Sequence, residues 1–110
     1  SLGQEDHVSM GSIGGRKALK VCNNLVNILA IEMLCATQAI DFQRPLKSSN
    51  ILEQVHVEIR KNITHAKADR IFSKDINKAA KLIESKELIS ITHKASRSVN
   101  SEFESIVEIF

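Results

Sequence analysis

The sequence predicts an all-α protein, and three observations support this class. One proline and four glycines among 110 residues are too few for the many turns of an all-β protein. All four glycines fall within the first fifteen residues, so the remainder can form long uninterrupted helices. Apolar residues, which make up 43% of the chain, then recur at helical spacing. We therefore expect one long buried helix plus shorter amphipathic helices.

Residues 1–15 are predicted to form an irregular loop, because glycine and serine interrupt them repeatedly. One long helix is expected from Arg16 to Phe42, where Arg44-Pro45 ends it. Its second half is apolar on nearly every face, and such a helix must be buried all round. A chain of this length with three helices can hardly surround it. The helix is therefore expected to be part of a larger helical bundle, with more chain or more subunits.

Two shorter amphipathic helices should follow. Asn50 is the predicted N-cap of the first, with Glu53 at the capping-box position. Residues 64–72 are expected to be a connection, and Ser73 the N-cap of the second helix, with Asp75 in its first turn. The expected apolar faces are Ile51, Leu52, Val55, Ile59 and Ile63, then Ile76, Ala79, Ala80, Ile83 and Leu88.

The C-terminal part gives a weaker pattern. Residues 90–101 are polar and suggest irregular structure, and residues 103–110 suit a short helix or a strand about equally well. The sequence thus divides into an active-site loop (1–15), a helical region (16–94) and a tail of unknown role (95–110).

Charge and cysteine usage narrow the class of protein. A net charge of +2 is too small to indicate a nucleic-acid partner. The best apolar run, residues 25–40, is interrupted by polar side chains, so neither a signal peptide nor a membrane span is expected. Cys22 and Cys35 would lie about 20 Å apart on one helix, too far to form a disulfide. We expect both to be buried in that helix, and unpaired cysteines suit a reducing compartment.

The chemistry of the chain concentrates in the loop from Gln4 to Gly11. Glu5 is the first candidate, because a carboxyl group desolvated beside a buried helix can exchange protons or hold a cationic ring. A solvated loop carboxylate is the competing interpretation. Gln4 could orient a substrate, or be a surface amide. Asp6, His7 and Ser9 lie too close in sequence to build a nucleophile triad. The four histidines show no metal-ligand spacing, so no metal site is predicted.

A family resemblance adds to this interpretation. It is carried by Gln4-Glu-Asp-His-Val-Ser-Met-Gly11, Arg16-Lys17-Ala18-Leu19, the run from Ala30 to Phe42, Arg44-Pro45-Leu46, Asp69-Arg70 and Asp75-Ile76. Over about residues 1–90 these segments resemble the C-terminal half of the histidine ammonia-lyases, members of the aromatic amino acid lyases that use a methylidene-imidazolone (MIO) group.

The resemblance implies a function. It implies a cytoplasmic, mostly helical homotetramer that eliminates ammonia from L-histidine to give trans-urocanate, opening histidine catabolism. The electrophile would be the MIO group, formed from an Ala-Ser-Gly tripeptide, in active sites shared between subunits. Glu5 would face the substrate imidazole, binding it and assisting proton transfer. Gln4 would line the site beside it.

The sequence departs from this family in what it lacks. It contains no Ala-Ser-Gly tripeptide and no tyrosine, although a tyrosine supplies the family's base. It also begins Ser-Leu-Gly without methionine. We therefore expect a C-terminal fragment that is inactive alone. Two alternatives stay open at this point: a fragment of a phenylalanine or tyrosine ammonia-lyase, and a non-catalytic helical oligomerisation module.

Overall fold

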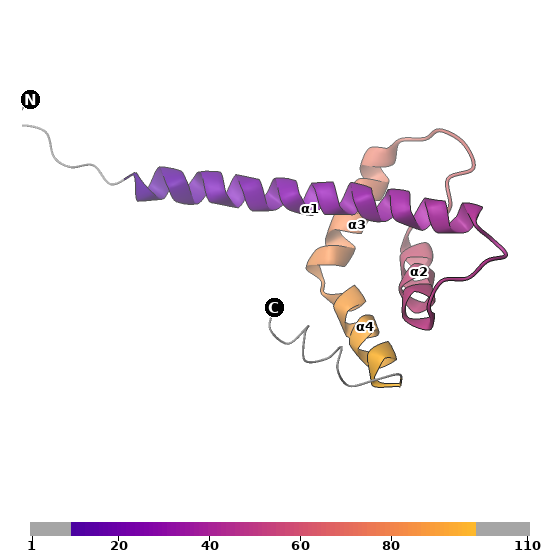
Figure 1. The fold of residues 1–110 in the computed structure, drawn as a ribbon. Helices are drawn as coiled ribbons and strands as arrows, with labels where there is room; N and C mark the ends of the chain where they lie inside the picture. The colour runs from indigo at the N-terminus through magenta and orange to yellow at the C-terminus, as the bar shows by residue number, and fades with distance from the viewer. Residues whose placement is uncertain (1–9, 99–110) are drawn as a thin grey trace, which may run out of the picture.

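A computed structural model describes residues 10–98, and Figure 1 shows them as helices joined by short connections. The described residues contain no strand, which confirms the all-α class. α1 packs mainly against α3, and α2 packs mainly against α4. The helices are α1 (Gly11–Phe42), α2 (Asn50–Asn62), α3 (Phe72–Glu84) and α4 (Glu87–Arg97).

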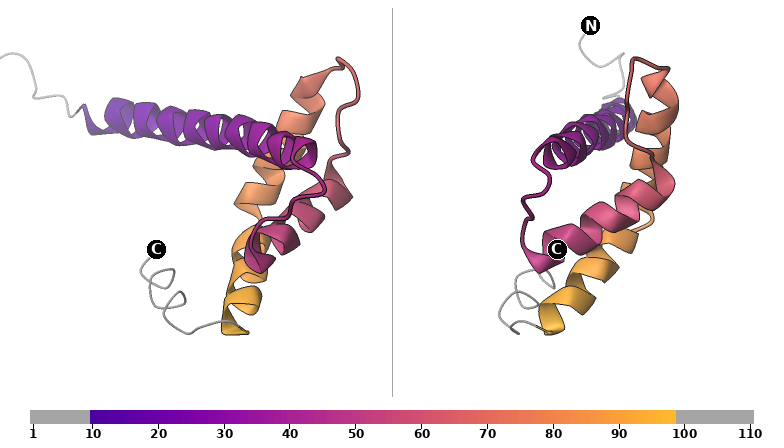
Figure 2. Two further views of the ribbon diagram at one scale, coloured as in Figure 1. Left: turned by 45° about the vertical axis from the view of Figure 1, so that its right-hand side comes forward. Right: turned by 90° about the vertical axis from the view of Figure 1, so that its right-hand side faces the viewer.

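The hydrophobic core lies where α3 crosses the C-terminal half of α1 (Figures 1 and 2). Ala30 on α1 and Ala79 on α3 are both fully buried, and such small side chains let two helices approach closely. Ile59, Ile63 and Leu82 complete the buried cluster. The core is therefore small and centred on this crossing, while α2 and α4 form a second packed pair.

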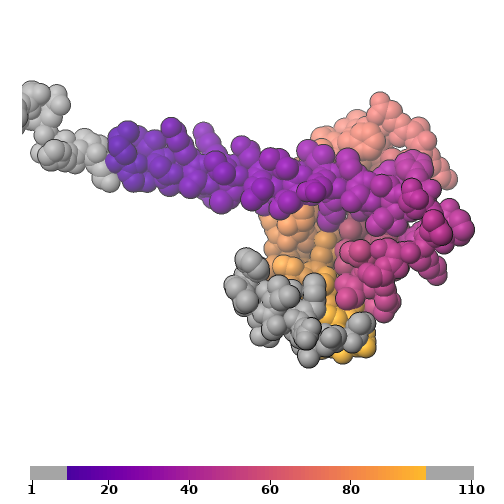
Figure 3. All heavy atoms as spheres, viewed as in Figure 1, coloured from indigo at the N-terminus to yellow at the C-terminus, as the bar shows by residue number. Residues whose placement is uncertain are grey.

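The N-terminal half of α1 projects beyond the other helices (Figures 1 and 3). Within α1 only Ala30 and Thr37 are buried. Leu19, Val21 and Leu25 are 62%, 64% and 52% exposed. The chain therefore leaves most of its long helix exposed. This agrees with the expectation that more chain or more subunits are needed to bury it. The prediction that Cys22 and Cys35 are buried is wrong, because both are exposed, whereas the prediction that they are unpaired is confirmed.

The length and composition of α1 would also allow it to cross a membrane. Its most apolar 18-residue window has a mean hydropathy of 1.5. The core helix of a soluble protein can meet the same conditions. This property does not separate the two cases, so the absence of a membrane span stays a prediction.

α1 begins earlier than predicted. The loop was expected to extend to residue 15, but residues 11–15 are helical. An added Cβ at Gly14 or Gly15 would meet no atom within 4 Å, so both glycines lie on an open face of the helix. Glycine in a helix costs about 1 kcal/mol relative to alanine, and the long helix that follows tolerates this cost. Residues 1–9 of the predicted loop lie outside the described part of the chain.

The N-caps of α2 and α3 also differ from the prediction. Ser49, not Asn50, is the N-cap of α2, and its hydroxyl oxygen accepts a 3.3 Å hydrogen bond from the backbone N–H of Leu52. The predicted capping box is therefore wrong, and Leu52, expected on the buried face, is 51% exposed. α3 begins at Phe72 with no side-chain cap, so the predicted role of Ser73 is wrong, whereas Asp75 does lie in its first turn.

The predicted third helix is in fact two. Lys86 adopts a left-handed backbone conformation with φ of 61°, which separates α3 from α4. Leu88, assigned to the apolar face of the third helix, lies on α4. The expectation of irregular structure from residue 90 is wrong through Arg97, because α4 continues to that residue and buries Ala95 and Ser96. The rest of the predicted tail, residues 99–110, lies outside the described residues.

Candidate functional site

Gln4 and Glu5, the predicted site residues, lie outside the described part of the chain. The structure does show the helix end that follows them. Met10 is the N-cap of α1 and supplies no capping side chain, and no acidic residue lies in the first turn. The backbone N–H groups and the nearby Arg16 and Lys17 make this helix end positive, which favours an anionic group beside it.

A polar cluster around Asp41, the Asp41 cluster, joins the C-terminal end of α1 to α2 and to the connection that follows α2. Oδ1 of Asp41 accepts a 2.7 Å hydrogen bond from Nε2 of His56. Oδ2 accepts hydrogen bonds from Nδ1 of His65 at 2.7 Å and from Nε and Nη2 of Arg60 at 2.9 and 2.6 Å. The side chains of Asp41 and Arg60 are each 17% exposed. One carboxylate therefore ties three parts of the chain together.

These contacts set the charge state of Asp41. Partial burial raises the pKa of its carboxyl group, but the hydrogen bonds from His65, Arg60 and His56 lower it more. The pKa falls from 3.8 to about 2. Asp41 is therefore a permanent anion at neutral pH, compensated directly by the Arg60 guanidinium.

A second ion pair closes the connection between α1 and α2. Arg44 Nη1 and Nη2 donate to the two carboxylate oxygens of Glu53 at 2.9 and 2.8 Å, a bidentate arrangement. Oε1 of Glu53 also accepts a 2.8 Å hydrogen bond from the backbone N–H of Ser48. The guanidinium and this N–H lower the pKa of Glu53 from 4.5 to about 2. Glu53 thus holds the connection between α1 and α2 near its start, at Arg44, and near its end, at Ser48.

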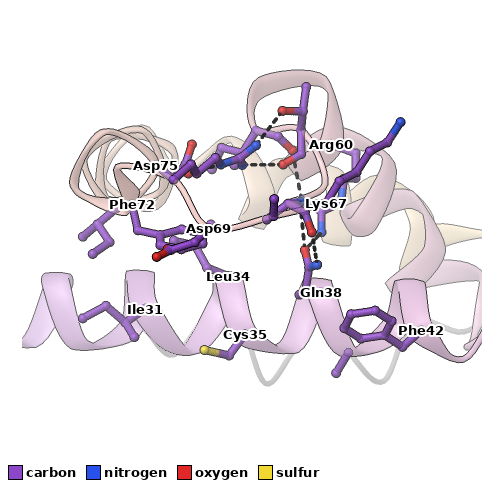
Figure 4. Close-up of a pocket in the computed structure, with 17 residues that line it drawn as sticks. Ile31, Leu34, Cys35, Gln38, Phe42, Arg60, Lys67, Asp69, Phe72 and Asp75 are labelled. Carbon is purple, nitrogen blue, oxygen red and sulfur yellow. Dashed lines mark hydrogen bonds and ion pairs between the residues drawn. The ribbon is translucent and has the colours of Figure 1, made fainter.

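A groove of about 590 Å³ lies between α1, the connection after α2 and α3 (Figure 4). Its α1 side is mostly apolar, and Figure 4 shows Ile31, Leu34 and Phe42 spaced along that helix. The opposite wall includes Arg70, which donates a 2.8 Å hydrogen bond to Asp75. The groove therefore combines an apolar floor with a paired polar rim.

The groove lies far from the N-terminal end of α1. The groove reaches α1 only from Ile31 onward. The loop precedes Gly11, twenty residues earlier, which is about 30 Å along a helix at 1.5 Å per residue.

The Asp41 cluster was not predicted from the sequence, where the histidines show no metal-ligand spacing. The available signal was the spacing of His56 and Arg60, four residues apart and so on one face of α2. Within residues 10–98, no group of histidine, cysteine and acidic side chains has an arrangement that could hold a metal ion.

Comparison with known proteins places this fold in a family. The family model described as aromatic amino acid lyase matches residues 1–61, more than half of the chain. The chain therefore belongs to the aromatic amino acid lyase family.

Individual proteins of this family show which of its members the chain resembles. Over 94 residues, 86% of the chain, it is 42% identical to the histidine ammonia-lyase of Natranaerobius thermophilus. Over 83 residues, 76% of the chain, it is 48% identical to that of Pseudoalteromonas atlantica. The crystal structure of histidine ammonia-lyase from Trypanosoma cruzi superposes with a TM-score of 0.79 over 86% of this chain, at 39% identity. The chain covers only 18%, 16% and 19% of these three proteins.

Proposed function

We propose that this chain forms part of a histidine ammonia-lyase, which eliminates ammonia from L-histidine to give trans-urocanate in histidine catabolism. The observation that carries this proposal is the identity of 42% and 48% to two relatives of that name. The family match begins at residue 1, so it includes the segment that contains Gln4 and Glu5.

In this proposal Glu5 is the catalytic residue, and Gln4 and Glu5 bind substrate. The carboxylate of Glu5 would accept a charge-assisted hydrogen bond from an N–H of the imidazole ring and assist proton transfer. Gln4 would supply a neutral donor and acceptor beside it. A phenyl ring offers no N–H, so a buried carboxylate facing it would lack a partner. This favours histidine over phenylalanine or tyrosine as the substrate.

The residues of this chain do not fit the formation of the MIO group. The sequence has neither an Ala-Ser-Gly tripeptide nor any tyrosine. The electrophile and the base would therefore be supplied by other parts of the enzyme. We expect no rise in urocanate absorbance when the purified 110-residue chain is mixed with L-histidine. Urocanate formation by this chain alone would contradict the proposal that its site is incomplete.

The proposal includes a cytoplasmic homotetramer with neither a nucleic-acid nor a membrane partner. The apolar surface of α1 supports the oligomer, because Leu19, Val21 and Leu25 are all more than half exposed. Full burial of an exposed Leu or Val side chain is worth about 1.5–3 kcal/mol, so burying the exposed part of each of these contributes roughly half of that. The exposed, unpaired Cys22 and Cys35 suit a reducing compartment.

A comparison of substrates tests the proposed specificity. The assembled lyase that contains this region is assayed with L-histidine, L-phenylalanine and L-tyrosine, and each unsaturated product is followed by its ultraviolet absorbance. We expect kcat/KM for histidine to exceed the other two by at least about 10³-fold, because a site built to bond an N–H rejects rings without one. Comparable values for phenylalanine or tyrosine would favour the related lyases, and no product from any substrate would favour a non-catalytic module.

A further inference from the structure

The orientation of the Gln38 side-chain amide is fixed by its neighbours. Oε1 accepts hydrogen bonds from Nη2 of Arg60 at 3.2 Å and from the backbone N–H of Ala66 at 3.3 Å. Nε2 donates to the backbone carbonyl of Ala66 at 2.9 Å. A flipped amide would place like groups against each other at all three contacts. The NH₂ group of Gln38 is therefore assigned by the network.

This orientation defines the tautomer of His65. Nδ1 of His65 lies 2.7 Å from Asp41 Oδ2 and must donate, because an ionised carboxylate only accepts. Nε2 lies 3.3 Å from the NH₂ group of Gln38, which only donates, so this nitrogen must accept. These contacts assign the proton of His65 to Nδ1 and leave Nε2 as the acceptor.

The contacts of His56 assign its proton to the other nitrogen. Nε2 donates to Asp41 Oδ1 at 2.7 Å, while Nδ1 faces Nη2 of Arg44 at 3.5 Å. Since a guanidinium only donates, Nδ1 accepts. The two rings on one carboxylate thus hold opposite tautomers. They differ in access to solvent, because the His65 side chain is 33% exposed and the His56 side chain 10%.

The charged groups around His65 come from each part of the chain that packs against it. Asp41 on α1 attracts a proton to the ring, and Arg60 on α2 opposes this attraction. Arg70, in the same connection as His65, donates to its backbone carbonyl at 3.5 Å. The remaining α1 neighbour is the Phe42 ring, edge-on with centroids 5.7 Å apart.

We propose that the contact between His65 and Gln38 is a proton-sensitive latch, which holds Ala66 against α1 while His65 is neutral and is broken on protonation, although the bond from His65 to Asp41 remains. Protonation of Nε2 would place an N–H against the NH₂ group of Gln38, so two donors would face each other. Gln38 cannot flip without losing its bonds to Ala66 and Arg60. It would have to move away, which releases Ala66. Because Thr64, Ala66 and Lys67 line the groove, acidification would loosen one groove wall.

The test follows both nitrogens of each histidine ring in the ¹⁵N-labelled 110-residue chain. Long-range ¹H–¹⁵N spectra distinguish the two tautomers directly. At neutral pH we expect the Nδ1–H tautomer for His65 and the Nε2–H tautomer for His56. A neutral His65 with its proton on Nε2, or a His65 already protonated at neutral pH, would overturn the proposal.

A second readout is hydrogen exchange of the Ala66 amide, expressed as a protection factor so that the intrinsic pH dependence of exchange is removed. As His65 becomes protonated, we expect Ala66 protection to fall at least tenfold. The control is the Ser85 amide, bonded to the carbonyl of Lys81 at 2.9 Å, whose protection should not follow His65. An Ala66 protection factor that does not change as His65 becomes protonated would also overturn the proposal.

The variant Gln38→Glu separates a latch from a merely structural contact. A carboxylate at this position accepts the Nε2–H of a protonated His65, so the titration midpoint of His65 should rise by at least about one pH unit. His93 on α4 serves as the reference ring, and its midpoint should not change. An unchanged His65 midpoint would contradict the role of Gln38, and the spectra of the unmodified chain decide the proposal if the variant fails to fold.

Discussion

The side-chain amide of Gln38 pairs with both backbone polar groups of Ala66. Its Nε2 donates to the Ala66 carbonyl at 2.9 Å, and its Oε1 accepts from the Ala66 N–H at 3.3 Å. A side chain of α1 thus satisfies the backbone of a connection 28 residues later in the chain. This pairing, with the Asp41 cluster beside it, positions the wall of the groove.

Replacing Gln38 with alanine should destabilise the fold. The substitution leaves both polar groups of the half-buried Ala66 without their partner, which costs about 1–3 kcal/mol of unfolding free energy. Urea unfolding of the 110-residue chain, followed by circular dichroism, measures the change.

Gln54→Ala is the matched control for that substitution. Gln54 is exposed on α2 and donates only a 3.4 Å hydrogen bond to Asn50. We expect its removal to cost less than about 0.5 kcal/mol. Equal losses from the two substitutions would contradict the role given to Gln38.

The fold should lose stability in acid. The pKa of Asp41 falls from 3.8 to about 2 and that of Glu53 from 4.5 to about 2. A carboxyl group with a lowered pKa stabilises the fold above its unfolded pKa, and this stabilisation is lost as pH falls through the folded pKa. Unfolding free energy should therefore drop as pH falls from about 4.5 to about 2.

Asp41→Asn isolates the contribution of the cluster to that pH dependence. The variant should be less stable at neutral pH by about 1–2 kcal/mol, because the partly exposed cluster is screened by water. Its stability should also depend less on pH between 4 and 2. A variant with the same acid profile as the unmodified chain would show that Asp41 does not contribute as described.

Association through α1 can be tested with two leucines of nearly equal exposure. Leu25 on α1 is 52% exposed and Leu52 on α2 is 51% exposed. In the assembled lyase, Leu25→Asp should reduce the oligomer mass measured by sedimentation, because a charge would be buried in an apolar interface. Leu52→Asp is the control and should leave the mass unchanged. An intact oligomer with Leu25→Asp would exclude that part of α1 from the interface.

The sequence allowed much of the helical framework to be predicted. The end of α1 at Phe42 followed from Arg44-Pro45, since the backbone restriction before proline is local. The connection at 64–72 was also predicted, apart from Phe72, which begins α3. The separation of α3 from α4 could not be predicted from the local sequence. Lys86 takes a left-handed conformation there, and no glycine or proline marks this position.

The Asp41 cluster could not be predicted for a different reason. Its members come from positions 41 to 65, on α1, on α2 and in the connection after α2, and they meet only in the folded chain. Nothing in the local pattern around His56 or His65 indicates a shared carboxylate. The candidate site residues Gln4 and Glu5 were chosen instead from the polar residues of their loop, and the family resemblance suggested their roles. Their roles stay predictions, because they lie outside the described residues.

The central claim, that Glu5 acts on an imidazole substrate, is tested most directly by Glu5→Gln in the assembled lyase. Glutamine keeps the size of the side chain but cannot exchange a proton at neutral pH. The matched control is Glu84→Gln at an exposed position on α3. We predict that kcat for L-histidine falls about 10²-fold or more with Glu5→Gln and stays within twofold with Glu84→Gln. A Glu5→Gln enzyme with near-normal turnover would contradict the claim.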